Sequence, residues 1–256
     1  MRALACLLLT LCALRAGAEC PQPLRIAFLD KPLPRMLAGE GRDFADPPGL
    51  FVDWTQQALR QLGCKAELVR LPQKRLVSDT AAGYNQITFY LAHTPERAAQ
   101  LVFPERINGE PDPRLALAET HLALFVRADR IDRVQWDGQQ LSPSGLRVGV
   151  VGGGVEEPMA RRAGWRLDLA LNHFGSILKL RRGQVDVAVL PALSFTPEAL
   201  AEAPPLVELQ PPLHRIGFYA PVSPELKRRH PQFVRRFWQA ACEAARGVRT
   251  SPSCTP

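Results

Sequence analysis

Short apolar strands alternate with amphipathic helices along this chain, and the alternation runs twice with a proline-rich stretch between the two runs. The first run has strand-like segments at 24–29, 66–71 and 87–91 and helix-like segments at 50–62 and 75–82. Strand, helix, strand order predicts parallel strands joined by right-handed crossovers. The chain is therefore predicted to have an α/β architecture.

The pattern starts again after the proline-rich stretch 108–113. Strand-like segments at 121–126, 147–151, 166–169 and 185–190 enclose helix-like segments at 156–163 and 176–182, and a second proline-rich stretch follows at 204–212. A strand at 216–220 and helices at 224–230 and 232–246 complete the chain. Two α/β units joined by two crossover segments predict a bilobed protein with a cleft, in which residues 19–108 with 213–256 form lobe 1 and 109–212 form lobe 2.

The first 18 residues have the pattern of a cleavable export signal. Arg2 precedes an apolar run at 3–14, and Ala16 to Ala18 supply the small residues at which a signal peptidase cuts. The run is shorter than the roughly 20 residues of a membrane-spanning helix. A lipoprotein acylated at Cys20 is the alternative, but such a site needs a small preceding residue and Glu19 stands there. We expect a periplasmic protein that starts near Glu19.

Four cysteines remain after the signal, and an even number in an oxidising compartment predicts disulfides. Cys20 lies just before the first strand and Cys64 just before the second. If these strands are parallel neighbours, their starts lie side by side, which favours a Cys20–Cys64 pair and leaves Cys242 with Cys254. No CxxC pair or HExxH motif occurs, so neither a metal nor another cofactor is expected.

The charge of the chain indicates what kind of partner it attracts. Loss of Arg2 and Arg15 with the signal lowers the formal net charge from +7 to +5. This excess favours a small anionic ligand by long-range attraction, although an arginine-rich composition in general explains it equally well. The basic pairs are scattered and lack aromatic neighbours, so nucleic-acid binding is not expected.

Several short motifs occur in an order that resembles family 3 extracellular solute-binding proteins over essentially the whole mature length. They are, in chain order, Arg25-Ile26-Ala27-Phe28, Gly49-Leu50-Phe51-Val52-Asp53-Trp54, Leu62-Gly63-Cys64, Thr94-Pro95-Glu96-Arg97, Leu101-Val102-Phe103, Trp136-Asp137-Gly138, the segment from Val148 to Gly154, and the segment from Leu180 to Val189. The resemblance implies a type II periplasmic-binding-protein fold, whose lobes close on a small solute.

The resemblance also implies a role for Arg97, because the arginine of the matching motif in amino-acid binders pairs with the ligand α-carboxylate. Only a planar guanidinium supplies that bidentate geometry. An ion pair with Glu96 or Glu105 is the structural alternative.

A second implied contact is the turn of Gly153, Gly154 and Val155, which leads from a strand into a helix and would offer backbone N–H groups to an anion. The sequence departs from the family here, because Gly154 and Val155 stand where serine and threonine are common. Pro191 likewise replaces the acid that binds a ligand ammonium, which puts ordinary α-amino-acid binding in doubt.

Four further residues are candidates for the cleft. Asp30 follows the first strand, at the edge where ligands bind in open α/β sheets, but caps turns equally often. Tyr90 and His93 would stack on or hydrogen-bond a ligand, or else pack in the core. Arg75 would contact an anion or form a surface ion pair.

These features together predict a periplasmic solute-binding protein that is not an enzyme. It would capture a small anionic or carboxylate-bearing solute, work as a monomer, and deliver the solute to an inner-membrane ABC permease or a sensor. Two alternatives stay open: an accessory or sensory protein that uses the fold without transport, and an enzyme resembling cyclohexadienyl dehydratase, with Asp30, Glu156 and His93 as acid or base.

Overall fold

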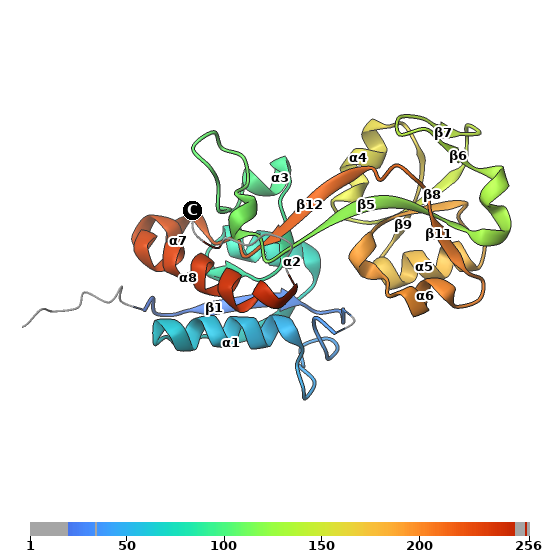
Figure 1. The fold of residues 1–256 in the computed structure, drawn as a ribbon. Helices are drawn as coiled ribbons and strands as arrows, with labels where there is room; N and C mark the ends of the chain where they lie inside the picture. The colour runs from blue at the N-terminus through green and yellow to red at the C-terminus, as the bar shows by residue number, and fades with distance from the viewer. Residues whose placement is uncertain (1–19, 34, 249–253, 255–256) are drawn as a thin grey trace, which may run out of the picture.

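Two lobes linked by two long strands make up the computed structural model, which describes residues 20–33, 35–248 and 254 (Figure 1). The predicted export signal lies outside these residues. Across the described ranges, no helix is long and apolar enough to cross a membrane.

The first lobe contains a three-stranded parallel sheet of order β2-β1-β3. Its elements are β1 (Arg25–Leu29), α1 (Leu50–Leu62), β2 (Glu67–Leu71), α2 (Gln73–Ala81), β3 (Ile87–Thr88), β4 (Leu91–Ala92), α3 (Pro95–Ala98), η1 (Pro113–Leu115), α7 (Pro224–Arg229), α8 (Pro231–Ala244) and η4 (Arg246–Val248). The crossover helix α1 ends at Gly63, whose left-handed φ of 68° lets its N–H reach the carbonyl of Arg60. The chain therefore turns sharply from α1 back into β2, which pairs in parallel with β1.

Two antiparallel strands, β5 (Ala118–Arg127) and β12 (His214–Tyr219), run between the lobes (Figure 1). They are the centre of a larger sheet of order β4-β12-β5-β10-β8-β9, in which β10 is Val187–Pro191, β8 is Arg147–Val151 and β9 is Arg166–Ala170. A further strand, β11 (Leu206–Glu208), also pairs with β5. One sheet therefore extends from β4 in the first lobe to the edge strand β9 in the second.

The second lobe is built on parallel strands β10, β8 and β9. Its elements are η2 (Ala128–Arg133), β6 (Gln135–Trp136), β7 (Leu141–Ser142), β8 (Arg147–Val151), α4 (Glu156–Arg162), β9 (Arg166–Ala170), α5 (His173–Arg181), β10 (Val187–Pro191), η3 (Ala192–Ser194), α6 (Pro197–Ala201) and β11 (Leu206–Glu208). Valines 148, 150, 187 and 189 are fully buried in its core. The predicted bilobed α/β fold with two crossover segments is thus confirmed.

The strand predicted at 87–91 is two strands in the structure. β3 pairs with β1, whereas β4 pairs with β12 in the other sheet. Tyr90 lies between them with a positive φ of 69°, a conformation that ends an extended segment. The apolar run alone gave no sign of this break.

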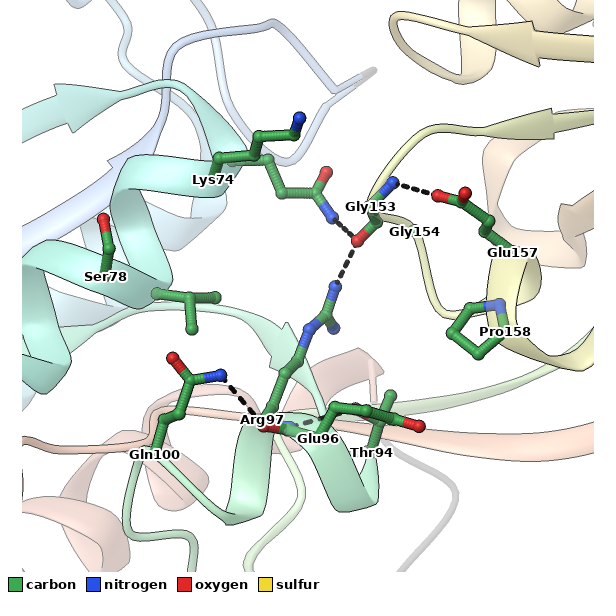
Figure 2. A pocket seen from close by; sticks show the side chains of 12 residues that line it. Lys74, Ser78, Thr94, Glu96, Arg97, Gln100, Gly153, Gly154, Glu157 and Pro158 are labelled. Carbon is green, nitrogen blue, oxygen red and sulfur yellow. Dashed lines mark hydrogen bonds between the residues drawn. The ribbon is translucent and has the colours of Figure 1, made fainter.

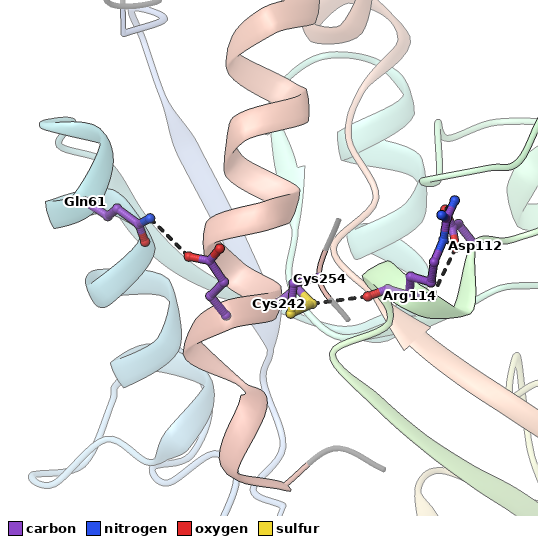
Figure 3. The surroundings of a disulfide bond; sticks show 6 residues. Gln61, Asp112, Arg114, Cys242 and Cys254 are labelled. Carbon is purple, nitrogen blue, oxygen red and sulfur yellow. Dashed lines mark hydrogen bonds and ion pairs between the residues drawn. A yellow bond between two sulfur atoms is a disulfide. The ribbon is translucent and has the colours of Figure 1, made fainter. Parts of the chain in front are cut away.

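Both predicted disulfides are present. Cys20 pairs with Cys64 beside the starts of β1 and β2, and Cys242 pairs with Cys254. The second disulfide attaches the chain's end to the buried side of α8, where the Cys242 sulfur lies 3.2 Å from the carbonyl oxygen of Arg114 (Figure 3). On the other side of α8, the Gln61 side chain of α1 donates to Glu243 at 3.1 Å. The first lobe's core, which includes Phe28, Phe51, Phe233 and Phe237, is thus closed by α1 and α8.

Candidate functional site

The short helix α3 sets the position of Arg97. Thr94 caps the helix by accepting the N–H of Arg97 on its side-chain oxygen at 3.3 Å, and Pro95 occupies the first helical turn. Both residues fix where the helix begins, and this in turn fixes the position from which the Arg97 side chain extends.

The Arg97 guanidinium crosses from the first lobe to the second. Its side chain is buried, with 8% of the residue exposed. Nη1 donates to the carbonyl of Ala92 in its own lobe at 2.8 Å. Nη2 donates to the carbonyl of Gly153 in the other lobe at 3.1 Å (Figure 2). Arg97 is therefore a direct contact between the lobes.

A second donor converges on the same Gly153 carbonyl. Gln73, the first residue of α2, donates from Nε2 at 2.9 Å. The Gln73 amide comes from α2 and the Arg97 guanidinium from α3, so two elements of the first lobe donate to this one oxygen. The structure thus places two side-chain donors around a single oxygen acceptor between the lobes.

The Arg97 charge has no carboxylate in contact. Burial lowers the pKa of Arg97 to about 10, an effect that the charges of Glu156 and Glu96 partly oppose. Both hydrogen-bond acceptors are neutral carbonyls, and no ion pair to Arg97 forms among the described residues. The guanidinium therefore remains charged at neutral pH while its counter-charges lie beyond contact distance.

The glycine turn after β8 presents a carbonyl to the cleft, because acceptors of its own lobe take its N–H groups. The N–H of Gly152 donates to Ala170, that of Gly153 to the Glu157 carboxylate at 2.7 Å, and that of Gly154 to Val151. Glu157 lies in the first turn of α4, where an acid is favoured by the helix dipole.

Glu156 explains why a glycine stands at position 154. Its carboxylate is buried and accepts the N–H of Val151 at 3.1 Å, and it lies 3.4 Å from Nε2 of His173. A Cβ added to Gly154 would come within 2.5 Å of the Glu156 carboxylate. The serine or threonine common in the family at this turn would therefore displace a buried acid.

A cavity of about 330 Å³ lies around these contacts and is bounded by both lobes (Figure 2). Its lining residues are, from α2, Gln73, Lys74, Val77 and Ser78; from the α3 segment, Thr94, Glu96, Arg97 and Gln100; and from the second lobe, Gly153, Gly154, Glu157 and Pro158. The volume is at the small end of the roughly 300–1,000 Å³ common for ligand pockets.

Comparison with known proteins shows similarity at the level of structure only. No family model and no curated protein matches the sequence. The GluR0 ligand-binding core from Nostoc punctiforme, in complex with L-glutamate, has a TM-score of 0.68 at 15% identity, over 88% of this chain and 97% of that one. AncCDT-1, an ancestral amino acid-binding protein and precursor of cyclohexadienyl dehydratase, gives 0.63 at 14%, over 88% and 93%. An engineered mutant of ArgBP from T. maritima gives a TM-score of 0.61 at 16% identity, over 88% of each chain. The chain has the bilobed periplasmic-binding-protein fold.

Within this periplasmic-binding-protein fold, Arg97, Gly153 and Gly154 line the cavity between the lobes, whereas the other predicted site residues lie outside its lining. Arg75 pairs with Asp79 one turn along α2, with Nη2 2.9 Å from Oδ2. Val155 packs against the core of the second lobe.

Asp30 lies in the loop after β1 and uses its backbone for turns, because its N–H donates to Leu71 and its carbonyl accepts from Gly41. Its carboxylate also acts on Arg70, whose pKa is lowered by burial and partly restored by the charge of Asp30.

Tyr90 and His93 are both packed against aromatic rings. Tyr90 stacks between Phe51 and Phe218, and burial raises the pKa of its hydroxyl. His93 meets Phe103 edge to face, and its Nε2 has no hydrogen-bond partner among the described residues. Burial lowers the pKa of His93, and Glu105 partly opposes this.

Sequence reasoning missed the α2 wall of the cavity. Gln73, Lys74, Val77 and Ser78 are spaced as one face of a helix, and this spacing was the available signal. Pro191, the last residue of β10, is buried and pairs with Leu122, so no acid is present at that strand end. Across the described residues no cluster of histidine, cysteine or acidic side chains has the makings of a metal site.

Proposed function

We propose that this chain is a periplasmic solute-binding protein that captures a small carboxylate-bearing solute in the cavity between its lobes, for uptake or sensing. The observation that carries the proposal is Arg97: a buried guanidinium in a cavity bounded by both lobes, whose contacts are two neutral carbonyls. A buried cation is stabilised most by an anion in direct contact. A solute carboxylate supplies one.

The location and partners of the protein belong to the same proposal. The predicted export signal and the two disulfides support a periplasmic protein, because disulfides persist in that oxidising compartment. Closure of the lobes on a solute would give an inner-membrane ABC permease or a sensor a shape to recognise. We expect the protein to act as a monomer.

The structural relatives leave the charge of the ligand open, since one is a complex with glutamate and ArgBP has been solved with arginine bound. The cleft of this chain is more informative. Arg97 and Lys74 bring positive charge to it, while Pro191 stands where an acid for an ammonium would be. We therefore favour an anionic solute over an amino acid.

Binding is favoured over catalysis by the arrangement of the acid–base candidates. AncCDT-1 is a precursor of a dehydratase, and such a reaction needs an acid or base in contact with substrate. Asp30, Glu156 and His93 are not among the residues that line the cavity. The two acids that do line it, Glu157 and Glu96, face arginines of the second lobe. Incubation with prephenate, followed spectroscopically, tests this choice, because turnover would establish an enzyme.

A thermal-shift screen against carboxylates, amino acids, sugars and polyamines tests the proposed function. A solute at 100 times its dissociation constant stabilises by about 2.7 kcal/mol. For a protein of this size that amounts to roughly 5–11 °C. A carboxylate that stabilises the protein, but not an Arg97→Gln variant, supports the proposal; a folded protein that responds to no solute contradicts it and favours the accessory role.

A further inference from the structure

We infer that Gln73 and Lys74 make the cleft selective for a small dicarboxylate: one carboxylate replaces the Gly153 carbonyl oxygen between Arg97 and Gln73, and the other meets Lys74. The inference rests on the proposed function, since it names the solute class of the same cavity.

The first carboxylate position follows from the two donors around the Gly153 oxygen. Arg97 and Gln73 come from different elements, yet both reach this oxygen, at 3.1 and 2.9 Å. A carboxylate oxygen accepts from the same donors and adds the negative charge that a carbonyl lacks. Entry of the solute breaks only these two hydrogen bonds at Gly153 and replaces them with charge-assisted ones.

The second position follows from the distribution of charge around the cavity. The two acids in the lining are already compensated: Glu157 pairs with Arg161 at 2.6 Å, and Glu96 lies 3.9 Å from Arg162. The two cations in the lining, Arg97 and Lys74, make no ion pair among the described residues.

Glu157 makes its hydrogen bonds within its own lobe, to the N–H of Gly153 and to the Arg161 guanidinium. The N–H of Gly153 and then the Arg161 guanidinium lower the pKa of Glu157, and the more distant charge of Lys74 adds to the effect. Figure 2 places Lys74 on the α2 wall, across the cavity from Glu157. Its ammonium is therefore free to meet a solute anion.

Together these groups describe the solute that the cavity fits. Two cationic groups from α2 and α3, a neutral amide donor beside Lys74 and about 330 Å³ of space suit a short chain with a carboxylate at each end. A zwitterion or a cation would bring its positive charge toward Arg97 and Lys74, where it is repelled.

The test is isothermal titration with matched pairs of solutes, succinate with propionate and glutarate with butyrate, in which the second member lacks one carboxylate. The wild-type protein is expected to prefer the dicarboxylate of each pair. Gln73→Ala should weaken dicarboxylate binding by about tenfold, because a hydrogen bond to a charged group is lost. Lys74→Ala should reduce the preference for two carboxylates over one.

Gln57→Ala and Lys65→Ala are matched controls on exposed positions outside the cavity, and they should bind as the wild type does. Gln73→Glu keeps the shape of the side chain but adds a negative charge, so it should abolish dicarboxylate binding. Unchanged affinities in all the α2 variants would overturn the inference. Stabilisation of the wild type by neutral or cationic solutes alone would also overturn it while leaving solute binding intact, whereas no response to any solute class counts against the proposed function itself.

Discussion

Tyr90 lies face to face with Phe218, with ring centroids 4.3 Å apart and an angle of 6° between the rings. The other face of Tyr90 stacks on Phe51 at 3.9 Å. Phe51 belongs to α1 and Phe218 to the linking strand β12, so this stack fastens the first lobe to one of the two strands that lead to the second. The same residue separates β3 from β4, which places the two strands in different sheets.

Tyr90→Ala is therefore expected to lower the free energy of unfolding by about 2 kcal/mol, below the roughly 3–5 kcal/mol of fully buried aromatic residues, because Tyr90 is only partly buried. Tyr90→Phe keeps the stack and should stay close to the wild type. Urea unfolding of the three proteins measures both effects. If Tyr90→Phe instead leaves stability alone but weakens solute binding, the hydroxyl contacts the ligand, as the sequence suggested.

Arg97→Lys should weaken binding of the solute found in the screen by about ten- to a hundredfold, because a single ammonium cannot make the paired hydrogen bonds of a guanidinium. The substitution keeps the charge, so it separates geometry from electrostatics. Arg60→Lys on the exposed face of α1 is the matched control. Equal affinities for wild type and Arg97→Lys by isothermal titration would falsify the carboxylate role.

Much of the fold was predictable from the sequence, because it depends on the periodicity of apolar residues and on the glycines and prolines that end helices and strands. Gly63 ends α1 at the predicted residue, and the parallel pairing of β1 with β2 brings Cys20 to Cys64 as expected. The site was less predictable. The glycines after β8 predicted free N–H donors for an anion. In the structure the Glu157 carboxylate accepts the N–H of Gly153, and the sequence pattern does not show where that side chain lies.

Periodicity also could not show which face of α2 meets the second lobe. The predicted helix starts at residue 75, whereas α2 starts at Gln73, so Gln73 and Lys74 fall outside the prediction. Their importance also depends on how the lobes are placed, and β5 and β12 determine that placement. The left-handed conformation of Tyr90 was hidden for the same reason, since aromatic partners from distant segments hold it.

Removal of the two disulfides should have unequal effects. The Cys20–Cys64 link closes a sequence separation of 44 residues and the Cys242–Cys254 link one of 12. Loop-closure entropy makes the longer link more stabilising by about 1 kcal/mol. We expect Cys20→Ala with Cys64→Ala to lower the unfolding free energy more than Cys242→Ala with Cys254→Ala. The opposite order would show that loop-closure entropy does not decide the difference between the two links.

His93 should make stability depend on pH in the mildly acidic range. Burial lowers the pKa of His93 in the folded protein, so below the ordinary value of about 6.5 the unfolded chain binds more protons than the folded one. Stability from this residue is present at higher pH and is lost as the pH falls below about 6.5.

His93→Phe keeps an aromatic ring against Phe103 and removes the titration. The fall in unfolding free energy between about pH 8 and about pH 5.5 should be smaller in this variant than in the wild type. His214→Phe changes an exposed histidine and is the control. Identical pH dependence in His93→Phe and wild type would mean that other groups produce the effect.

Gly149 and Ser176 form a tight contact between β8 and α5 that a double-mutant cycle can measure. A Cβ at position 149 would lie 3.1 Å from the Ser176 hydroxyl oxygen and 3.2 Å from a methyl of Val185. Gly149→Ala should therefore destabilise the second lobe by about 1–3 kcal/mol, as overpacking does.

The Ser176 hydroxyl is buried without a hydrogen-bond partner among the described residues, so Ser176→Ala alone should be neutral or stabilising. In the double variant the hydroxyl no longer opposes the new methyl group, and the two effects should be non-additive, with Ser176→Ala recovering part of the loss. Strict additivity in urea unfolding would show that the methyl groups of Val185, rather than the Ser176 hydroxyl, account for the cost of the added methyl group.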